Sequence, residues 1–215
     1  MNYKAILFDF DYTLGDSTNG IVLSVNYALV KLGHVQKSVE DIRKTIGLSL
    51  KDTYFTLTGD NNLNAAMLFS KYFKEKADRV MVDNTDLYPN VKESLLSLRH
   101  HGCKIGIVTT KFHYRIQQIL QKCNVPDLVD LIVGAEDVQI EKPNPEGLIL
   151  AVEQLGLLKE EVLYVGDSFV DAQTAQNAGI SFVGVLTGTT TREEFADYPN
   201  LYIGDTVAEI VNYVL

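Results

Sequence analysis

Two aspartates separated by one residue, Asp9 and Asp11, directly follow a short apolar run in the segment FDFDYTL. Residues two apart in an extended chain point the same way, so both carboxylates can reach one ligand. Carboxylates at the end of a buried strand cost free energy unless they are paired, and neighbouring ones repel each other. The two carboxylates of such a pair can have different roles in a phosphoryl transfer. One attacks phosphorus, while the other exchanges protons with the leaving oxygen and with water.

Polar side chains also follow three other apolar runs of the sequence. Thr109 and Thr110 come after KIGIV, Lys142 follows the loop after DLIVG, and Asp167 and Asp171 lie in VGDSFVD. In an open α/β sheet, ligands bind outside the carboxyl ends of the strands. We therefore expect these side chains to converge with the first two aspartates on one site.

The expected cluster of carboxylates favours a bound divalent cation. Converging carboxylates raise one another's pKa, and Mg²⁺, which prefers oxygen ligands, relieves this repulsion. We expect Asp9 and Asp167 to be ligands, while Asp171 either binds the ion through water or orients the groups that do. Thr109 and Lys142 would supply the donors and the positive charge that a phosphoryl group needs.

The hydrophobic periodicity predicts a parallel sheet that is interrupted once. A strand over 3–8 is followed by apolar residues at helical spacing from about 16 to 80. After that the pattern alternates, with strands over 104–109, 130–134, 162–166 and 181–185, helices over 90–100, 113–122, 144–155 and 169–178, then a short helix, a strand and a last helix from Thr206. Alternation of this kind indicates an α/β fold with helices on both faces of the sheet.

The helical segment is therefore expected to be an insertion into an α/β domain. We place the core domain at 1–15 and 86–215 and the inserted helical domain at 16–85. Phe69, Tyr72 and Phe73 lie at helical spacing and are expected in the core of the insertion.

Charge and composition limit the kinds of partner. The formal net charge of −9 and the pI near 4.9 would repel a nucleic-acid backbone, so we expect no nucleic acid as partner. The sequence has 2 cysteines without a CxxC pattern and no apolar run of membrane-spanning length. We expect a cytoplasmic protein with no membrane contact, as a monomer or a homodimer.

Four motifs together resemble those of the haloacid dehalogenase superfamily, in particular its phosphoglycolate phosphatase and β-phosphoglucomutase-like group. DFDYTL is similar to the DxDxT/V motif, IVTTK to the motif that ends in Thr109, EKPNP to the lysine motif at Lys142, and VGDSFVD to the GDSxxD motif. Four motifs in the right order, each at the end of an expected strand, are jointly specific.

The resemblance implies a Rossmann-like three-layer core with a helical C1 cap. It also implies Asp9 as nucleophile, Asp11 as general acid and base, and Thr109 and Lys142 on the phosphate. Mg²⁺ would be bound by Asp9, Asp167 and the backbone carbonyl of Asp11.

The sequence departs from the family pattern at two places. Tyr12 replaces a common glycine, which could crowd the loop or add a hydroxyl near the cap entrance. Thr110 replaces a frequent asparagine, which leaves its backbone amide able to bind phosphate. Lys111 is expected to be a surface residue, and His113 is the histidine nearest the expected site.

These observations predict a Mg²⁺-dependent phosphatase that hydrolyses a small phosphorylated metabolite, phosphoglycolate-like or a sugar phosphate, through an aspartyl phosphate. A phosphomutase of the β-phosphoglucomutase type needs the same core and is the alternative. A non-catalytic phosphoryl-binding protein is a further alternative, and halide release is disfavoured because the second aspartate is present. The substrate would be read by the cap. Arg43, Lys44 and Lys51 are candidates for this role, and charge on a helix surface is the favoured interpretation of them.

Overall fold

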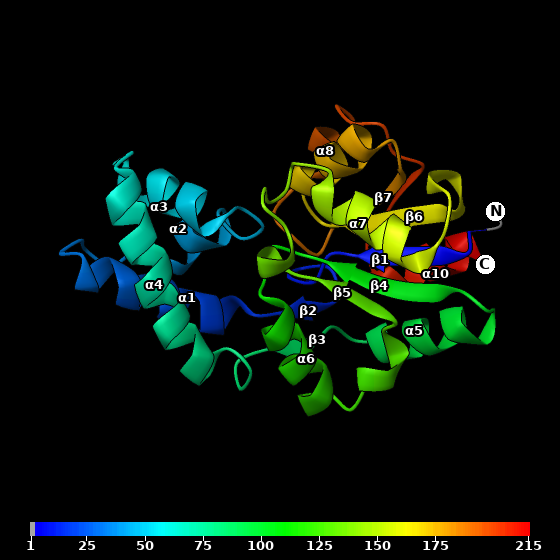
Figure 1. Ribbon diagram of the computed structural model, residues 1–215, viewed down its shortest axis with the longest axis horizontal. Coiled ribbons are helices and arrows are strands. Elements are labelled where there is room, and N and C mark those ends of the chain that lie inside the picture. The colour runs from blue at the N-terminus through cyan, green and yellow to red at the C-terminus, as the bar shows by residue number, and fades with distance from the viewer. Residues whose placement is uncertain (1–2) are drawn as a thin grey trace. The chain divides into compact units, whose positions relative to one another are not determined.

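Short apolar runs form a six-stranded parallel sheet in the computed structural model, which describes residues 3–215 (Figure 1). The strand order is β5-β4-β1-β6-β7-β8. The strands are β1 (Ala5–Phe8), β4 (Lys104–Val108), β5 (Leu131–Val133), β6 (Val162–Gly166), β7 (Ser181–Val185) and β8 (Tyr202–Gly204). The parallel sheet confirms the predicted α/β fold, although its first strand begins at Ala5 rather than at Tyr3.

Strand β1 lies inside the sheet, between β4 and β6, and its four residues are fully buried. Phe8 pairs with Ile107 on one side and with Val165 on the other. The N–H of Asp9 then donates to the carbonyl of Val165 at 2.9 Å, which extends the pairing by one residue. Because all these strands are parallel, their carboxyl ends meet at one edge of the sheet.

Helices cover both faces of this sheet, as the alternating pattern predicts. Figure 1 shows α5 (Val91–His100) and α6 (His113–Lys122) on one face and α7 (Glu146–Leu155) and α8 (Phe169–Ala178) on the other. The C-terminal helix α10 (Val207–Val214) packs against α5. The remaining elements are α9 (Arg192–Phe195) and the short 3₁₀ turns η1 (Pro126–Leu128), η2 (Ala135–Asp137) and η3 (Lys159–Glu161).

Residues Ser17–Asp86 form a second compact unit, separate from the unit that contains the sheet. Its helices are α1 (Thr18–Lys31), α2 (Val39–Arg43), α3 (Leu50–Thr58) and α4 (Leu63–Val80). Helix α3 begins after Ser49, whose hydroxyl accepts the N–H of Asp52, and ends at Gly59, whose φ of 72° is favourable for glycine. Phe69 and Phe73 lie in the core of this unit.

A two-stranded sheet of β2 (Gly15–Asp16) and β3 (Asp86–Leu87) joins the chain segments at the two ends of the helical unit. Two residues are too few to show a periodicity, so the sequence did not predict this pairing. The N–H of Tyr88 donates to the carbonyl of Leu14 at 3.0 Å just beside it.

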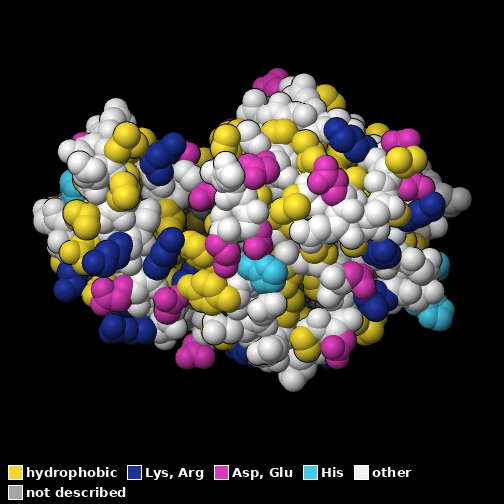
Figure 2. Space-filling model, viewed as in Figure 1, with side chains coloured by type: hydrophobic (Ala, Val, Ile, Leu, Met, Phe, Trp, Pro, Cys, Tyr) yellow, Lys and Arg dark blue, Asp and Glu magenta, His cyan; other side chains and the backbone are white. Residues whose placement is uncertain are grey.

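The described helices include none with the length and apolar character that a membrane span requires. On the face shown in Figure 2, Lys and Arg side chains are interspersed with Asp and Glu side chains and with hydrophobic ones.

Phe69→Ala tests the packing of the helical unit. The ring is fully buried, so its removal should lower the free energy of unfolding by about 3–5 kcal/mol. Leu68→Ala, on the same helix with the side chain 44% exposed, should change it by about 0.5 kcal/mol. Urea unfolding of both variants measures the difference, and equal losses would contradict the packing.

Candidate active site

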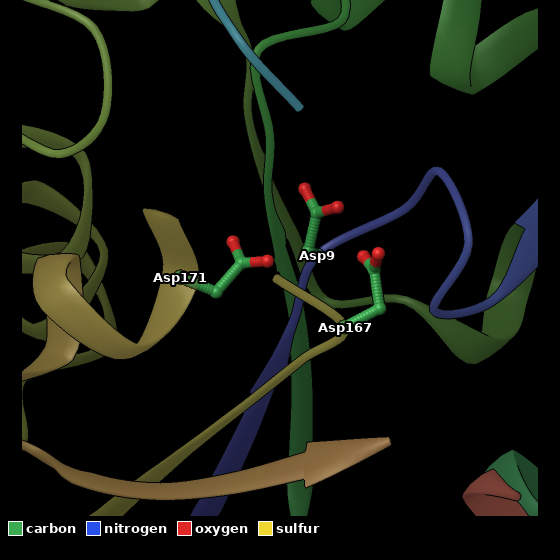
Figure 3. A group of neighbouring side chains, drawn as sticks. All are labelled: Asp9, Asp167 and Asp171. Carbon is green, nitrogen blue, oxygen red and sulfur yellow. The ribbon is translucent and has the colours of Figure 1, made fainter. Parts of the chain in front are cut away.

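Three aspartates meet at the carboxyl edge of the sheet (Figure 3). Asp9 follows β1, Asp167 follows β6, and Asp171 lies in the first turn of α8, and all three are at most 5% exposed. One carboxylate oxygen from each lies within 4.8 Å of the others. Figure 3 shows Asp9 between the other two, with their carboxylates directed toward it.

Lys142, from the loop before α7, lies between two of these carboxylates. Its Nζ is 2.7 Å from Asp9 Oδ1 and 2.6 Å from Asp171 Oδ1. The other oxygen of Asp171 accepts the N–H of Ser168 at 3.1 Å and its hydroxyl at 2.5 Å. Because both oxygens of Asp171 already accept hydrogen bonds, Asp9 and Asp167 are better placed to hold a cation.

Tyr164 also belongs to this cluster, although its sequence position does not suggest it. Its hydroxyl accepts a hydrogen bond from Lys142 Nζ at 3.1 Å and lies 2.9 Å from Asp171 Oδ1 and 3.0 Å from the carbonyl of Val108. The residue is fully buried in β6. Within the apolar run VLYVG a tyrosine is ordinarily read as a core aromatic residue, and the only sequence signal is that its hydroxyl needs a buried partner.

Asp11 has a lysine of its own. Lys111 Nζ is 3.0 Å from Asp11 Oδ2, and Lys111 is 6% exposed. The prediction that Lys111 lies at the surface was therefore wrong, because the loop after β4 turns its side chain inward onto a buried carboxylate. Asp11 Oδ1 is buried and has no hydrogen-bond partner among residues 3–215.

Three threonines lie at the site, two of them after β4 and one after β1. Thr109 is 5% exposed at the end of β4, and its Oγ1 accepts the N–H of Lys111 at 3.2 Å. Thr110 is half-buried beside it. The hydroxyl of Thr13 donates to Asp167 Oδ1 at 3.2 Å. Thr109 and Thr110 thus lie at the same sheet edge as the acids.

The backbone at Tyr12 has a conformation that favours the glycine which the resemblance implies at this position. Tyr12 has a φ of 62°, which a tyrosine rarely adopts and a glycine adopts without strain. Its ring is buried, and its carbonyl accepts a hydrogen bond from the Thr187 hydroxyl. At Gly188, the residue after Thr187, a side chain would overlap the carboxylate of Asp167, so the loop that contains Thr187 requires glycine at this position.

The other residues considered from the sequence have these surroundings within their own units. His113 Nδ1 is 2.9 Å from Asp137 Oδ2, at the start of α6. In the helical unit, Lys51 Nζ is 3.9 Å from Asp52 Oδ1, Lys44 is exposed and Arg43 is half-buried. A substrate role for Arg43, Lys44 or Lys51 stays a prediction.

Burial and mutual repulsion dominate the electrostatics of the cluster. Burial raises the pKa of Asp9 to about 7, although the charge of Lys142 opposes the shift. Burial, followed by the charges of Asp171 and Asp9, raises the pKa of Asp167 well above its usual range. For Lys142, burial lowers the pKa, but Asp171 and Asp9 outweigh it and hold the pKa well above the ordinary value. Burial lowers the pKa of Lys111, which Asp11 partly offsets.

The cluster fits a divalent cation. Its four buried carboxylates, from Asp9, Asp11, Asp167 and Asp171, outnumber the two lysines that pair with them. Such an excess of negative charge is unfavourable in a buried site, and a cation between Asp9 and Asp167 would compensate for it. Carboxylate oxygens are the donors that hard cations prefer.

Similarity to known proteins shows the family to which the chain belongs. Residues 6–185 match the family described as "Haloacid dehalogenase-like hydrolase". The phosphoglycolate phosphatase of Salmonella choleraesuis is 30% identical, with 91% of this chain and 86% of that protein covered. The pyrophosphatase PpaX of Bacillus mycoides is also 30% identical, with 98% and 96% covered.

A solved structure agrees with this assignment. A haloacid dehalogenase-like hydrolase from Bacteroides fragilis is 42% identical and superposes with a TM-score of 0.94, covering 97% of this chain and 99% of its own. The chain therefore belongs to the haloacid dehalogenase-like hydrolases and is an enzyme of that family. This confirms the family that the four motifs indicated.

The raised pKa of Asp9 predicts a pH-dependent stability of the metal-free protein. Between about pH 4 and pH 7 the folded protein holds a proton on Asp9 that the unfolded chain releases, so this group lowers stability as pH rises. Asp9→Asn should therefore gain stability relative to wild type across this window, by up to about 1.4 kcal/mol per pH unit. Urea unfolding in a chelator measures the difference at each pH.

Asp197→Asn is the control for this experiment, because Asp197 is exposed. It should follow the wild-type pH dependence throughout. A constant difference between Asp9→Asn and wild type from about pH 4 to pH 8 would contradict the raised pKa.

Tyr164→Phe tests whether the Tyr164 hydroxyl stabilises the buried ammonium group of Lys142. The substitution keeps the buried ring but removes the hydroxyl that contacts Lys142, Asp171 and Val108, so it should destabilise the protein by about 1–3 kcal/mol. Tyr213→Phe, with the residue 40% exposed, is the matched control and should change stability by about 0.5 kcal/mol. Denaturant unfolding measures both changes. A free energy of unfolding of Tyr164→Phe equal to that of wild type would refute the stabilising role of the Tyr164 hydroxyl.

Proposed function

We propose that this enzyme is a Mg²⁺-dependent phosphatase that hydrolyses a small phosphomonoester through an aspartyl phosphate at Asp9. The observation that carries the proposal is the arrangement of two neighbouring aspartates, each paired with a different buried lysine. The names of the relatives, a phosphoglycolate phosphatase and a pyrophosphatase, support phosphoryl transfer from a small anionic substrate.

In the first step, a carboxylate oxygen of Asp9 attacks phosphorus and the bond from phosphorus to the leaving oxygen breaks. Lys142 and the backbone amide of Thr110 bind the phosphoryl oxygens, together with the Thr109 hydroxyl. Asp11 donates a proton to the leaving oxygen, so the product departs as a neutral hydroxyl group. The phosphoryl group is then an acyl phosphate on Asp9.

In the second step, Asp11 removes a proton from a water molecule that attacks the same phosphorus. The bond between Asp9 and phosphorus breaks, inorganic phosphate leaves, and the Asp9 carboxylate is regenerated. Asp11 is again protonated, so the cycle closes without another proton carrier. The separate lysine partners suit these separate roles, because Lys142 stays with the nucleophile while Asp11 exchanges its proton.

Asp9, Asp167 and the backbone carbonyl of Asp11 would hold the Mg²⁺. The ion would supply positive charge that offsets the buried carboxylates and the phosphoryl oxygens. Asp171 would orient Lys142 instead of binding the ion, because both its oxygens accept hydrogen bonds from the protein.

The helical residues 16–85 are proposed to be the cap that selects the substrate. Their compact unit has its own apolar core, so it can present a recognition surface without altering the sheet that carries the acids. We propose that residues 1–15 and 86–215 form the catalytic core domain.

Trapping the phosphoenzyme tests this function. Asp11→Asn cannot activate water, so after incubation with Mg²⁺ and p-nitrophenyl phosphate, whose leaving group needs little protonation, a phosphoryl group should accumulate on the peptide that contains Asp9. Asp9→Asn should show no such adduct and lose activity by about a thousandfold or more. Mass spectrometry of the peptides and phosphate release measure both effects.

Asp197→Asn, an exposed aspartate, should keep wild-type turnover. Phosphorylation of another residue, or equal activity of Asp9→Asn and wild type, would refute the nucleophile. The products distinguish the related reaction, because release of an isomerised sugar phosphate in place of free phosphate would indicate a phosphomutase.

A further inference from the structure

The loop after β7, residues 186–191, contacts the acid-bearing segments of the site, although the proposed reaction gives it no role. The hydroxyl of Thr187 donates to the carbonyl of Tyr12, in the segment after β1. At the next residue, the backbone of Gly188 packs directly against the carboxylate of Asp167. Because β6 lies between β1 and β7 in the sheet, the Thr187 hydroxyl reaches across the strand that ends just before Asp167.

Tyr12 is held in a backbone conformation that its side chain disfavours. Its φ of 62° lies in the left-handed region, which a tyrosine enters only at a cost in free energy. Residues keep such a conformation where the surrounding contacts hold them in it. The N–H of Tyr12 donates to the carbonyl of Gly15 at 2.8 Å, and its own carbonyl accepts the hydroxyl of Thr187. These two hydrogen bonds fix the backbone of Tyr12 from both sides.

The conformation of Tyr12 decides the direction of the Asp11 carbonyl. The carbonyl of Asp11 and the N–H of Tyr12 belong to one planar trans peptide group and point in opposite directions. A rotation about φ of Tyr12 would turn this whole group, and with it the carbonyl that is proposed to bind Mg²⁺. Thr187 is therefore placed to act on a proposed ligand without touching the ion or the substrate.

The same loop restrains Asp167, the proposed ligand that follows β6. The Gly188 backbone lies against one side of its carboxylate, and the Thr13 hydroxyl donates to Asp167 Oδ1 at 3.2 Å. Further along the loop, Thr190 Oγ1 accepts the N–H of Phe169 at 3.3 Å, at the start of α8. The loop after β7 thus connects the two chain segments that would hold the ion.

We propose that Thr187 is a positioning residue for the metal site, because its hydroxyl holds Tyr12 in the conformation that orients the Asp11 carbonyl. The inference rests on the proposed function, in which Asp9, Asp167 and this carbonyl bind Mg²⁺. Without the hydroxyl, Tyr12 relaxes toward conformations that a tyrosine prefers, and the site loses a preformed ligand. The affinity for Mg²⁺ falls, whereas the acids and lysines of the site stay in place.

Calorimetric titration of the metal-free protein with MgCl₂ tests the inference. Thr187→Val keeps the branched side chain but removes the hydroxyl, so its Kd for Mg²⁺ should rise by about 10–100-fold. Thr187→Ser keeps a hydroxyl and should restore most of the wild-type affinity. Thr189→Val is the matched control in the same loop, because Thr189 is exposed, and it should bind Mg²⁺ as wild type does.

Thermal unfolding in a chelator separates positioning from a general loss of stability. If Thr187 only stabilised the fold, Thr187→Val would have a lower Tm, but its folded form would bind Mg²⁺ with the wild-type Kd. The titration is therefore made well below the Tm of each variant. Thr187→Ala also lacks the hydroxyl and should show the same loss of affinity, so it replaces Thr187→Val if that variant does not fold.

Turnover of p-nitrophenyl phosphate gives a second measurement. Since the catalytic residues are unchanged, raising the Mg²⁺ concentration should bring the turnover of Thr187→Val back toward that of wild type. A wild-type Kd for Mg²⁺ in folded Thr187→Val would overturn the proposal, as would a loss of affinity that Thr187→Ser does not reverse or that Thr189→Val shares.

Failure of the proposed function gives different results. If wild type binds no Mg²⁺, the metal dependence of the proposed function is overturned, and the inference with it. If wild type binds Mg²⁺ but forms no phosphoenzyme at Asp9, the proposed nucleophile is wrong, while the titrations still decide the role of Thr187.

Discussion

The ammonium group of Lys142, held between the carboxylates of Asp9 and Asp171, is the interaction on which the site depends. It joins the end of β1, the loop before α7 and the first turn of α8, which are far apart in the sequence. Buried ion pairs repay their desolvation only with good geometry and further hydrogen bonds. The short distances and the Tyr164 hydroxyl supply both, and the pairing of β1 with β6 places the two acid-bearing segments side by side.

The same constraint accounts for the other groups at this edge of the sheet. Burial is the main reason why the pKa values of Asp9 and Asp167 are raised, and the repulsion among four buried carboxylates that only two lysines pair with adds to it. A cation and an anionic substrate would complete the site together, since the first attracts the second. The positive charge that this acidic chain provides at the site comes from Lys111 and Lys142, which are buried close to aspartates.

The sequence predicted those parts of the structure that a periodic pattern or strand-end chemistry specifies. The strands and helices of the sheet follow from apolar spacing, and the convergence of Asp9, Lys142 and Asp167 follows from their places at the ends of parallel strands. Lys111 could not be predicted to be buried, because a lysine after a strand is ordinarily exposed and the direction of the loop decides otherwise. The contact between the Tyr164 hydroxyl and Lys142 could not be predicted either. An aromatic residue inside an apolar run fits the pattern of a buried strand whether or not its hydroxyl has a partner.

The pairing of β2 with β3 has a consequence for how such enzymes can diversify. Because Gly15–Asp16 and Asp86–Leu87 are hydrogen-bonded neighbours, the chain leaves the sheet-bearing unit and re-enters it at almost the same point. A segment with adjacent ends can be exchanged for another of different length with little cost in loop-closure entropy. A different inserted segment could therefore take the place of this helical unit while the sheet and its buried carboxylates stay unaltered.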